Sequence, residues 1–393
     1  MHSLQLSPLW RKFSIFSLGL EGQGQQLKSV SKAHKMLCGG KGHHQDLGGR
    51  QGCSHAKRRG RLSMPGAQQC RISAMKLPNP SESMTSHMEE VGMPTSVGCV
   101  GMATRDTLIF VDEMPSADEA LVRVKNVVVC LGGKGVIPAL TLRRLGNAAG
   151  LLCLTSGAES DLRLNSLLGD SLGRKYLIPA LEAANAAWII IGGNGHTYTA
   201  VEERRCRDAW TDQLGTITSR FFDEFSAVYV AAEDPRLLSA ALTECAQRPT
   251  KVVVNVSSAL LGRLVEAPEI LEGLIARACC LIMNESENAS TIERLGISGW
   301  SAFASSWLRC IVVTAGSSGG RYSEAPFSRW TNFEPVRPTR DVTCPVGAGD
   351  VFAGAFLLSW LIESEPVSLA CQKAAAMASE KLVQQLTGLA LDG

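Results

Sequence analysis

The chain has 393 residues, of which 45% are hydrophobic, so it holds enough apolar material for a sizeable folded core. Its formal net charge of +2 at pH 7 gives no electrostatic reason to expect nucleic acid as a partner. No apolar run reaches the roughly 18–20 residues that span a bilayer, so the sequence predicts no membrane-spanning segment.

Residues 1–93 predict a basic N-terminal extension without stable structure. They are rich in Gly, Gln, Ser, Lys and Arg, hold very few acidic residues before Glu82, and show no sustained helical or strand period. Such a segment buries too little apolar surface to offset its ordering entropy. Its composition is typical of a transit peptide for a plastid or mitochondrion. Two alternatives stay open: a disordered tail on a cytoplasmic protein, or a start codon assigned upstream of the true one.

Residues 94–393 predict one α/β domain, in which short apolar runs alternate with helical patterns. The expected strands are 97–102, 127–131, 187–191, 197–203, 227–231, 251–256, 280–283 and 310–314. The expected helices are 138–145, 237–246, 351–362 and 370–385. Strands separated by helices form parallel sheets covered on both faces, so we expect ligands at the carboxyl ends of the strands.

The 13 cysteines are scattered and form neither a CxxC pair nor a Cys/His group with zinc-ligand spacing. An odd number of unpatterned cysteines in a chain of this size indicates reduced, mostly structural thiols. This favours a reducing compartment.

The most informative segment is residues 346–354, Val-Gly-Ala-Gly-Asp-Val-Phe-Ala-Gly. Small residues at Gly347, Ala348 and Gly349 let a ligand approach the backbone, and an apolar helix is predicted after them. The first N–H groups of that helix make an anion site suited to a phosphoryl group. Asp350 stands at its mouth, where a carboxylate can accept a proton from a hydroxyl. The alternative is a Gly-rich turn with Asp350 as the N-cap.

Three further segments place small, polar or charged residues after predicted strands, where ligands bind in open α/β sheets. They are Asn284 and Glu287 after 280–283, Thr314, Gly316 and Gly319 after 310–314, and Gly132, Gly133 and Lys134 after 127–131. The last group is not a Walker A loop, because no Ser or Thr follows the Gly-Lys pair with the required spacing.

Together these motifs resemble the PfkB, or ribokinase-like, family of carbohydrate kinases, over about the last three quarters of the chain. The resemblance implies a three-layer α/β sandwich with a central, mostly parallel sheet and a small β-sheet lid. The candidate lid segments are residues 107–129 and 188–210. A lid of this kind excludes water from the reaction and can form a homodimer interface.

The resemblance also implies roles for individual residues. Asp350 would be the catalytic base, with the amides of Gly347, Ala348 and Gly349 as the anion hole. Asn284 and Glu287 would organise the Mg²⁺–phosphate end of ATP, with Glu287 as the metal-associated carboxylate. Thr314, Gly316 and Gly319 would line the nucleotide site, and Asp106, Gly132, Gly133 and Lys134 would surround the acceptor.

Simpler interpretations stay open for several of these residues. Asp106 could be a solvated turn residue, and Lys134 an ordinary surface lysine. Glu287 could be a carboxylate favoured by a helix start, and Thr314 could simply end a strand.

Two positions depart from the family pattern. Ile137 stands where many sugar kinases of the family have an Asn that contacts the sugar, and an isoleucine side chain cannot form that hydrogen bond. Cys344 stands where members activated by potassium have an Asp in the cation site. The resemblance therefore leaves activation by a monovalent cation open.

The expected function is ATP-dependent phosphoryl transfer to a hydroxyl of a small sugar-type substrate. One alternative is a nucleoside kinase of the same fold. Another is a fructokinase-like protein that has lost activity and serves as a scaffold subunit, as some plastid proteins do. No nucleic acid or membrane partner is expected.

Overall fold

The computed structural model describes residues 96–114, 122–156, 172, 174–182, 185–193, 196–202, 211–303, 307–337 and 344–380. All of these lie in the second of two compact units, Glu82–Gly393. The predicted extension at residues 1–93 lies outside the described residues, so its disorder and its targeting role stay predictions.

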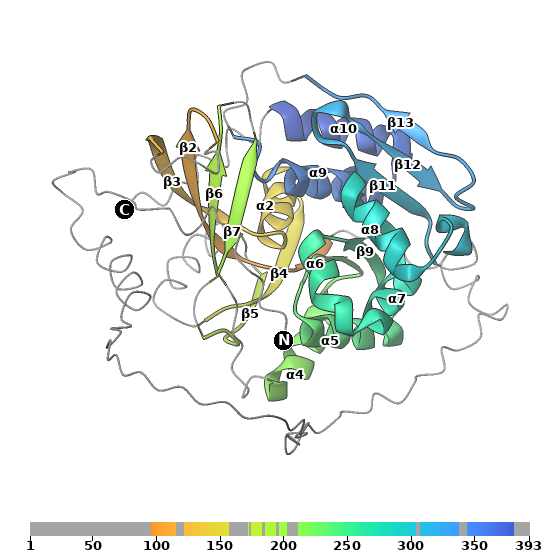
Figure 1. Ribbon diagram of the computed structural model, residues 1–393. Coiled ribbons are helices and arrows are strands. Elements are labelled where there is room, and N and C mark those ends of the chain that lie inside the picture. The colour runs from red at the N-terminus through yellow and green to blue at the C-terminus, as the bar shows by residue number, and fades with distance from the viewer. Residues whose placement is uncertain are drawn as a thin grey trace, which may run out of the picture. The chain divides into compact units, whose positions relative to one another are not determined.

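A nine-stranded sheet forms the centre of the described part of the chain, in the order β13-β12-β11-β10-β9-β8-β1-β4-β5 (Figure 1). The strands from β11 to β5 are all parallel, and β12 and β13 add an antiparallel edge. Their bounds are β1 Ser96–Val100, β4 Ala148–Leu154, β5 Arg174–Ile178, β8 Ala227–Val230, β9 Lys251–Asn255, β10 Ala278–Asn284, β11 Cys310–Thr314, β12 Gly320–Glu324 and β13 Thr331–Phe333. The mostly parallel sheet is confirmed.

Helices cover both faces of this sheet, which confirms the three layers. One buried cluster joins the sheet to α2 (Val136–Arg144), α9 (Ala348–Leu357) and α10 (Val367–Glu380). The other joins its opposite face to α4 (Thr211–Glu224), α5 (Pro235–Gln247), α6 (Ser258–Arg263) and α7 (Pro268–Arg277), with α8 (Glu285–Leu295) packed beside them. The predicted helix 351–362 begins earlier, at Ala348, and its last part is a π-helical turn, Leu358–Ile362.

Stacked aromatic rings fix α9 in its layer. The ring of Phe352 stacks on Phe333 of β13 at 5.8 Å and on Phe356 at 6.3 Å, and Phe356 stacks on Trp360 at 5.5 Å. Gly354 lies against α2, where an added Cβ would come within 2.9 Å of the Pro138 carbonyl oxygen. The start of α9 is therefore held between the edge of the sheet and α2.

A second, four-stranded sheet has the order β3-β2-β6-β7, and its strands are formed by described residues of both predicted lid segments (Figure 1). Residues 115–121, 194–195 and 203–210 of those segments lie outside the described residues. Its strands are β2 (Thr104–Val111), β3 (Val124–Gly132), β6 (Ala186–Ile191) and β7 (Thr197–Val201). It is mixed, because β2 pairs with β6 in parallel and the other pairs are antiparallel. We call it the lid sheet.

The inner face of the lid sheet packs on the chain that leads into α9. Leu108, Cys130 and Ile189 form a buried cluster with Cys344, and Val346 and Ala348 pack against it. The lid sheet and the Gly-rich segment before Asp350 thus share one apolar contact.

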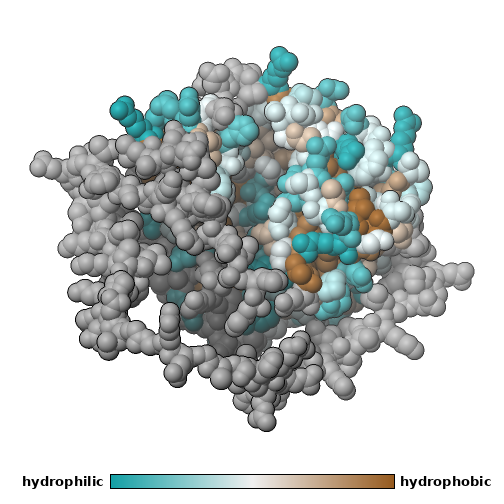
Figure 2. All heavy atoms as spheres, in the orientation of Figure 1, coloured by the Kyte–Doolittle hydropathy of each residue, from teal (hydrophilic) through white to brown (hydrophobic). Residues whose placement is uncertain are grey.

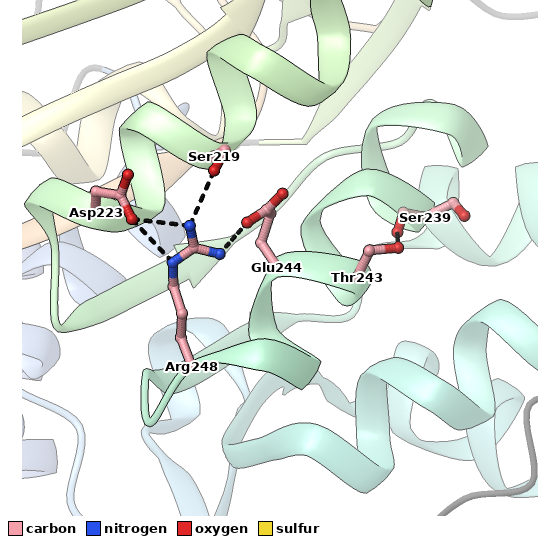
Figure 3. Close-up of polar contacts among 6 residues, drawn as sticks. All are labelled: Ser219, Asp223, Ser239, Thr243, Glu244 and Arg248. Carbon is pink, nitrogen blue, oxygen red and sulfur yellow. Dashed lines mark hydrogen bonds and ion pairs between the residues drawn. The ribbon is translucent and has the colours of Figure 1, made fainter.

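In the helix layer away from α9, Arg248 ties the end of α5 to α4 (Figure 3). Its Nη2 donates to Asp223 Oδ1 at 2.8 Å and to Ser219 Oγ at 2.9 Å, and Nε donates to the same Asp223 oxygen at 3.1 Å. Its Nη1 also pairs with Glu244 on α5. This network joins α4 to α5 and stabilises the helix layer on this face of the sheet.

The face in Figure 2 is mostly hydrophilic or neutral over the described residues, and its hydrophobic side chains gather in small patches. Among the helices that the structure describes, none is both long and apolar enough to cross a membrane.

Candidate active site

The segment before Asp350 turns into α9 through a left-handed glycine. Gly347 has φ +82° and is the N-cap, and its carbonyl accepts from the amides of Asp350 at 3.1 Å and Val351 at 2.9 Å. A Cβ added at Gly349 would meet no atom within 4 Å, so the first turn borders open space. The Ala348 amide donates to the Pro345 carbonyl at 3.2 Å, so the positive dipole end of α9 is the main feature of this turn that favours an anion. Asp350 is the third helical residue rather than the N-cap.

Lys134 follows strand β3 of the lid sheet and places a positive charge beside Asp350. Its Nζ lies 3.8 Å from Asp350 Oδ1. Burial raises the pKa of Asp350 and the Lys134 charge lowers it, while the charge of Glu287 raises it further. The pKa of Lys134 is raised in turn, mainly by the charge of Asp350. Lys134 is therefore an ion-pair partner of Asp350, and its contact with a substrate stays a prediction.

The glycines before Lys134 allow close contacts. Gly133 has φ +110°, and an added Cβ would lie 2.2 Å from the Met102 carbonyl oxygen. A Cβ on Gly132 would lie 1.9 Å from Asp106 Oδ2. A larger residue at 132 would displace the Asp106 carboxylate, and one at 133 would collide with the backbone just before β2.

Asp106 lies within β2 rather than in a turn, and it is buried. Burial raises its pKa to about 6, the hydrogen bond from the Thr104 side chain opposes this, and the charge of Asp350 adds to it. Asp106 and Asp350 therefore interact electrostatically, although Asp106 lies in the lid sheet and Asp350 in helix α9. The two carboxylates face a common region.

Asn284 and Glu287 form a capping box at the start of α8. Asn284 Oδ1 accepts from the Glu287 amide at 2.9 Å, and Glu287 Oε2 accepts from the Asn284 amide at 2.9 Å. Glu287 Oε1 also accepts from the Ser258 amide at 2.9 Å and its hydroxyl at 3.4 Å. Glu287 is therefore a helix-start carboxylate, as the simpler interpretation expects. Its negative charge also raises the pKa of both Asp350 and Lys134.

Thr314 ends β11 directly beside Asn284, its register partner at the end of β10. Gly316 has φ +58° with open space at its Cβ position. Gly319 has φ +82°, and a Cβ there would lie 2.4 Å from the Phe333 carbonyl oxygen. Both packing and the backbone conformation thus favour glycine at 319, whereas at 316 only the backbone conformation does.

Glu233 is a site residue that the sequence analysis missed. It follows β8, is buried, and its charge raises the pKa of Lys134. It also lines a cavity of about 80 Å³ with Gly101, Met102 and Asn185. The signal was present, because Glu233 and Asp234 follow a buried strand just as Asn284 does. Asp234 serves locally as the N-cap of α5.

A scan against protein-family models matches residues 94–392 to the pfkB family carbohydrate kinases. The chain belongs to this family. A search of curated proteins gives no match. Solved structures agree on the fold, at sequence identities too low to show more than that.

Three similar structures of the ribokinase-like fold illustrate this. The nucleoside kinase of Methanocaldococcus jannaschii has a TM-score of 0.56 at 18% identity, and the match covers 76% of this chain and 99% of that one. The Burkholderia thailandensis nucleoside kinase in complex with inosine has a TM-score of 0.58 at 18% identity, covering 72% and 89%. The Cryptococcus neoformans ribokinase in complex with ADP has a TM-score of 0.55 at 17% identity, covering 74% and 98%.

The two residues that depart from the family pattern, Ile137 and Cys344, are both buried in apolar contacts. Ile137 is buried against Val351 of α9, with Met377 of α10 beside them. Its side chain packs between helices, next to the residue that follows Asp350. Cys344 is buried against the lid sheet, and burial raises the pKa of its thiol.

Proposed function

We propose that this pfkB kinase transfers the γ-phosphoryl group of ATP to a hydroxyl of a small sugar-type acceptor. The observation that carries the proposal is the position of Asp350. It lies in the first turn of α9, beside open space at Gly349 and 3.8 Å from Lys134. A base and an anion-binding helix end therefore meet at one point, as in-line phosphoryl transfer requires.

In this mechanism the acceptor hydroxyl gives its proton to Asp350 as its oxygen attacks the γ-phosphorus, and the bond to the leaving ADP oxygen breaks. The amides of Gly347 and Gly349 and the dipole end of α9 stabilise the charge on the transferred group. The predicted part of the Ala348 amide is left out, because that amide donates to the Pro345 carbonyl at 3.2 Å. Asp106 and Glu233 hold other acceptor hydroxyls, supported by the glycines at 132 and 133.

The residues around Asn284 fit a Mg²⁺–nucleotide complex. Magnesium prefers oxygen ligands and keeps several waters, and when bound it neutralises charge on the phosphates. Glu287 already accepts three hydrogen bonds, of the roughly four that a carboxylate can take. It therefore suits contact with a metal-bound water better than direct ligation. Thr314, Gly316 and Gly319 line the nucleotide on the β11 side.

A nucleoside is the second candidate acceptor. The cavity beside Glu233 adjoins β2, the strand that contains Asp106. Asn185 lines the cavity, and its backbone carbonyl accepts a hydrogen bond from the Arg105 amide of β2 at 2.9 Å. It offers room for a group attached to the sugar. Two structures with this fold are named nucleoside kinases.

We also propose a homodimer through the outer face of the lid sheet. Two rows of side chains cross all four strands there and are apolar except for Thr107. The rows are Val127, Ile109, Ile190 and Tyr198, and Val129, Thr107, Trp188 and Ala200. Val127, Trp188 and Tyr198 are exposed, which favours a protein partner. Trp188→Lys should lower the mass measured by analytical ultracentrifugation from dimer to monomer. A wild-type monomer at micromolar concentration would contradict the proposal.

The test of the function is ADP release with ATP and magnesium over a panel of sugars and nucleosides. Asp350→Asn should lower kcat by roughly 10²–10⁴ and retain the wild-type melting temperature. Acceptor-dependent release that is lost in the variant supports a kinase and identifies its substrate class. ATP binding without turnover on any acceptor would instead favour the non-catalytic scaffold.

A further inference from the structure

Two buried polar side chains on adjacent strands each have an atom without a protein hydrogen-bond partner. Among the residues that the structure describes, the Tyr229 hydroxyl on β8 and Asn255 Oδ1 on β9 are buried and make no hydrogen bond. Tyr229 is 0% exposed and Asn255 is 7% exposed. Leaving such an atom unpaired costs about 1–3 kcal/mol, so two of them on adjacent strands need a physical reason.

The two side chains point to the same side of the sheet. Tyr229 pairs with Val253, and Asn255 is two residues beyond Val253 on the same strand. Because side chains alternate along a strand, Tyr229 and Asn255 share a face. With strands ~4.8 Å apart and a rise of ~3.3 Å per residue, their Cα atoms lie about 8 Å apart. This is the face that α9 covers, since Tyr229 belongs to the same buried cluster as Phe352 and Ala353.

Tyr229 lies within electrostatic reach of Asp350 and Glu287. Burial raises the pKa of its phenol well above the usual value, and the charges of Asp350 and Glu287 raise it further. The phenol therefore stays protonated and is a hydrogen-bond donor, whereas Asn255 Oδ1 is an acceptor. One water molecule can satisfy both, because a buried water makes about three hydrogen bonds to otherwise unpaired groups.

We propose that Tyr229 and Asn255 hold an internal water beneath the catalytic centre, and that Tyr229 is thereby a positioning residue for Asp350. The water hydrogen-bonds to both side chains and lies on the face of the sheet covered by α9, the helix that contains Asp350. The catalytic readout of this inference rests on the proposed function, but the water site does not.

Tyr229→Phe tests the positioning role, because it removes the hydroxyl and keeps the ring. We expect kcat to fall about tenfold, with KM for ATP and for the acceptor within twofold and no rise in melting temperature. Thr218→Val is the matched control. Its hydroxyl is also fully buried and unpaired, but it lies on α4 against the opposite face of the sheet, so kcat should not change.

Three results would overturn the inference. The first is an unchanged kcat with a higher melting temperature in Tyr229→Phe. That result would mean that the hydroxyl is unpaired in the folded protein and has no part in catalysis. The second is a fall in kcat only in proportion to lost folded protein. The third is a crystal structure of the wild-type protein without a water in hydrogen-bond distance of both atoms. If the wild type turns over no acceptor, the proposed function fails, and the crystal structure still decides whether the water site exists.

Discussion

Replacing Lys134 with Met tests the electrostatic control of Asp350. Two unit charges 3.8 Å apart attract by about 4 kcal/mol at an effective dielectric constant of ~20 and by about 1 kcal/mol in bulk water. The Lys134 side chain is 37% exposed, so we take the lower part of this range, about 1–2 kcal/mol. Methionine keeps a flexible apolar stem and removes the charge.

The loss of this charge raises the pKa of Asp350, because Lys134 favours the ionised carboxylate. On the acidic limb of the profile of kcat against pH, we expect a decrease of roughly 5–30-fold, since 1.36 kcal/mol corresponds to a factor of ten. At alkaline pH Asp350 is ionised in both proteins, so the deficit should close.

The assay is steady-state ADP release across the pH range, with Lys125→Met as control. Lys125 pairs with Asp112 on the lid sheet, and both side chains are more than half exposed. The control should match the wild type. A deficit in Lys134→Met that is the same at every pH, or that appears only in KM for ATP, would refute the reasoning. Such a result would assign Lys134 to phosphate binding instead.

Three further predictions concern other parts of the fold. KM for the acceptor should rise as pH falls through about 6, because Asp106 becomes protonated there and loses an acceptor lone pair; Asp106→Asn should remove this dependence. Gly349→Ala should leave the melting temperature unchanged or higher, since its Cβ meets open space in a helix, but should raise KM for ATP. Arg248→Met should lower the unfolding free energy, measured by urea denaturation, by about 1–2 kcal/mol and leave kcat per folded molecule unchanged.

The sequence predicted the parts of the site that local chemistry determines. The Gly-rich segment before Asp350 and the polar residues after β10 and β11 are recognisable from spacing alone, because strand ends and glycine turns have local signatures. The ion pair of Lys134 with Asp350 joins residues 216 positions apart (350 − 134), and only the fold brings them together.

Strand β4 shows why other parts could not be predicted. Its sequence, Ala-Ala-Gly-Leu-Leu-Cys-Leu, has a glycine at its third position that weakens the strand pattern. The reason for that glycine lies far along the chain, since a Cβ on Gly150 would come within 2.2 Å of the Phe225 ring. Tyr229 is a similar case, because a sequence shows a buried aromatic residue but not whether its hydroxyl finds a partner.

The apolar contact between the lid sheet and Cys344, Val346 and Ala348 limits how this enzyme can be re-engineered. The strand that would select the acceptor and the loop that would hold the phosphate are built against each other, so they are not separable modules. A lid taken from a relative would bring the wrong shape to Cys344 unless the residues at 344, 346 and 348 came with it. Changes of acceptor in this scaffold should therefore be sought as paired substitutions across that contact.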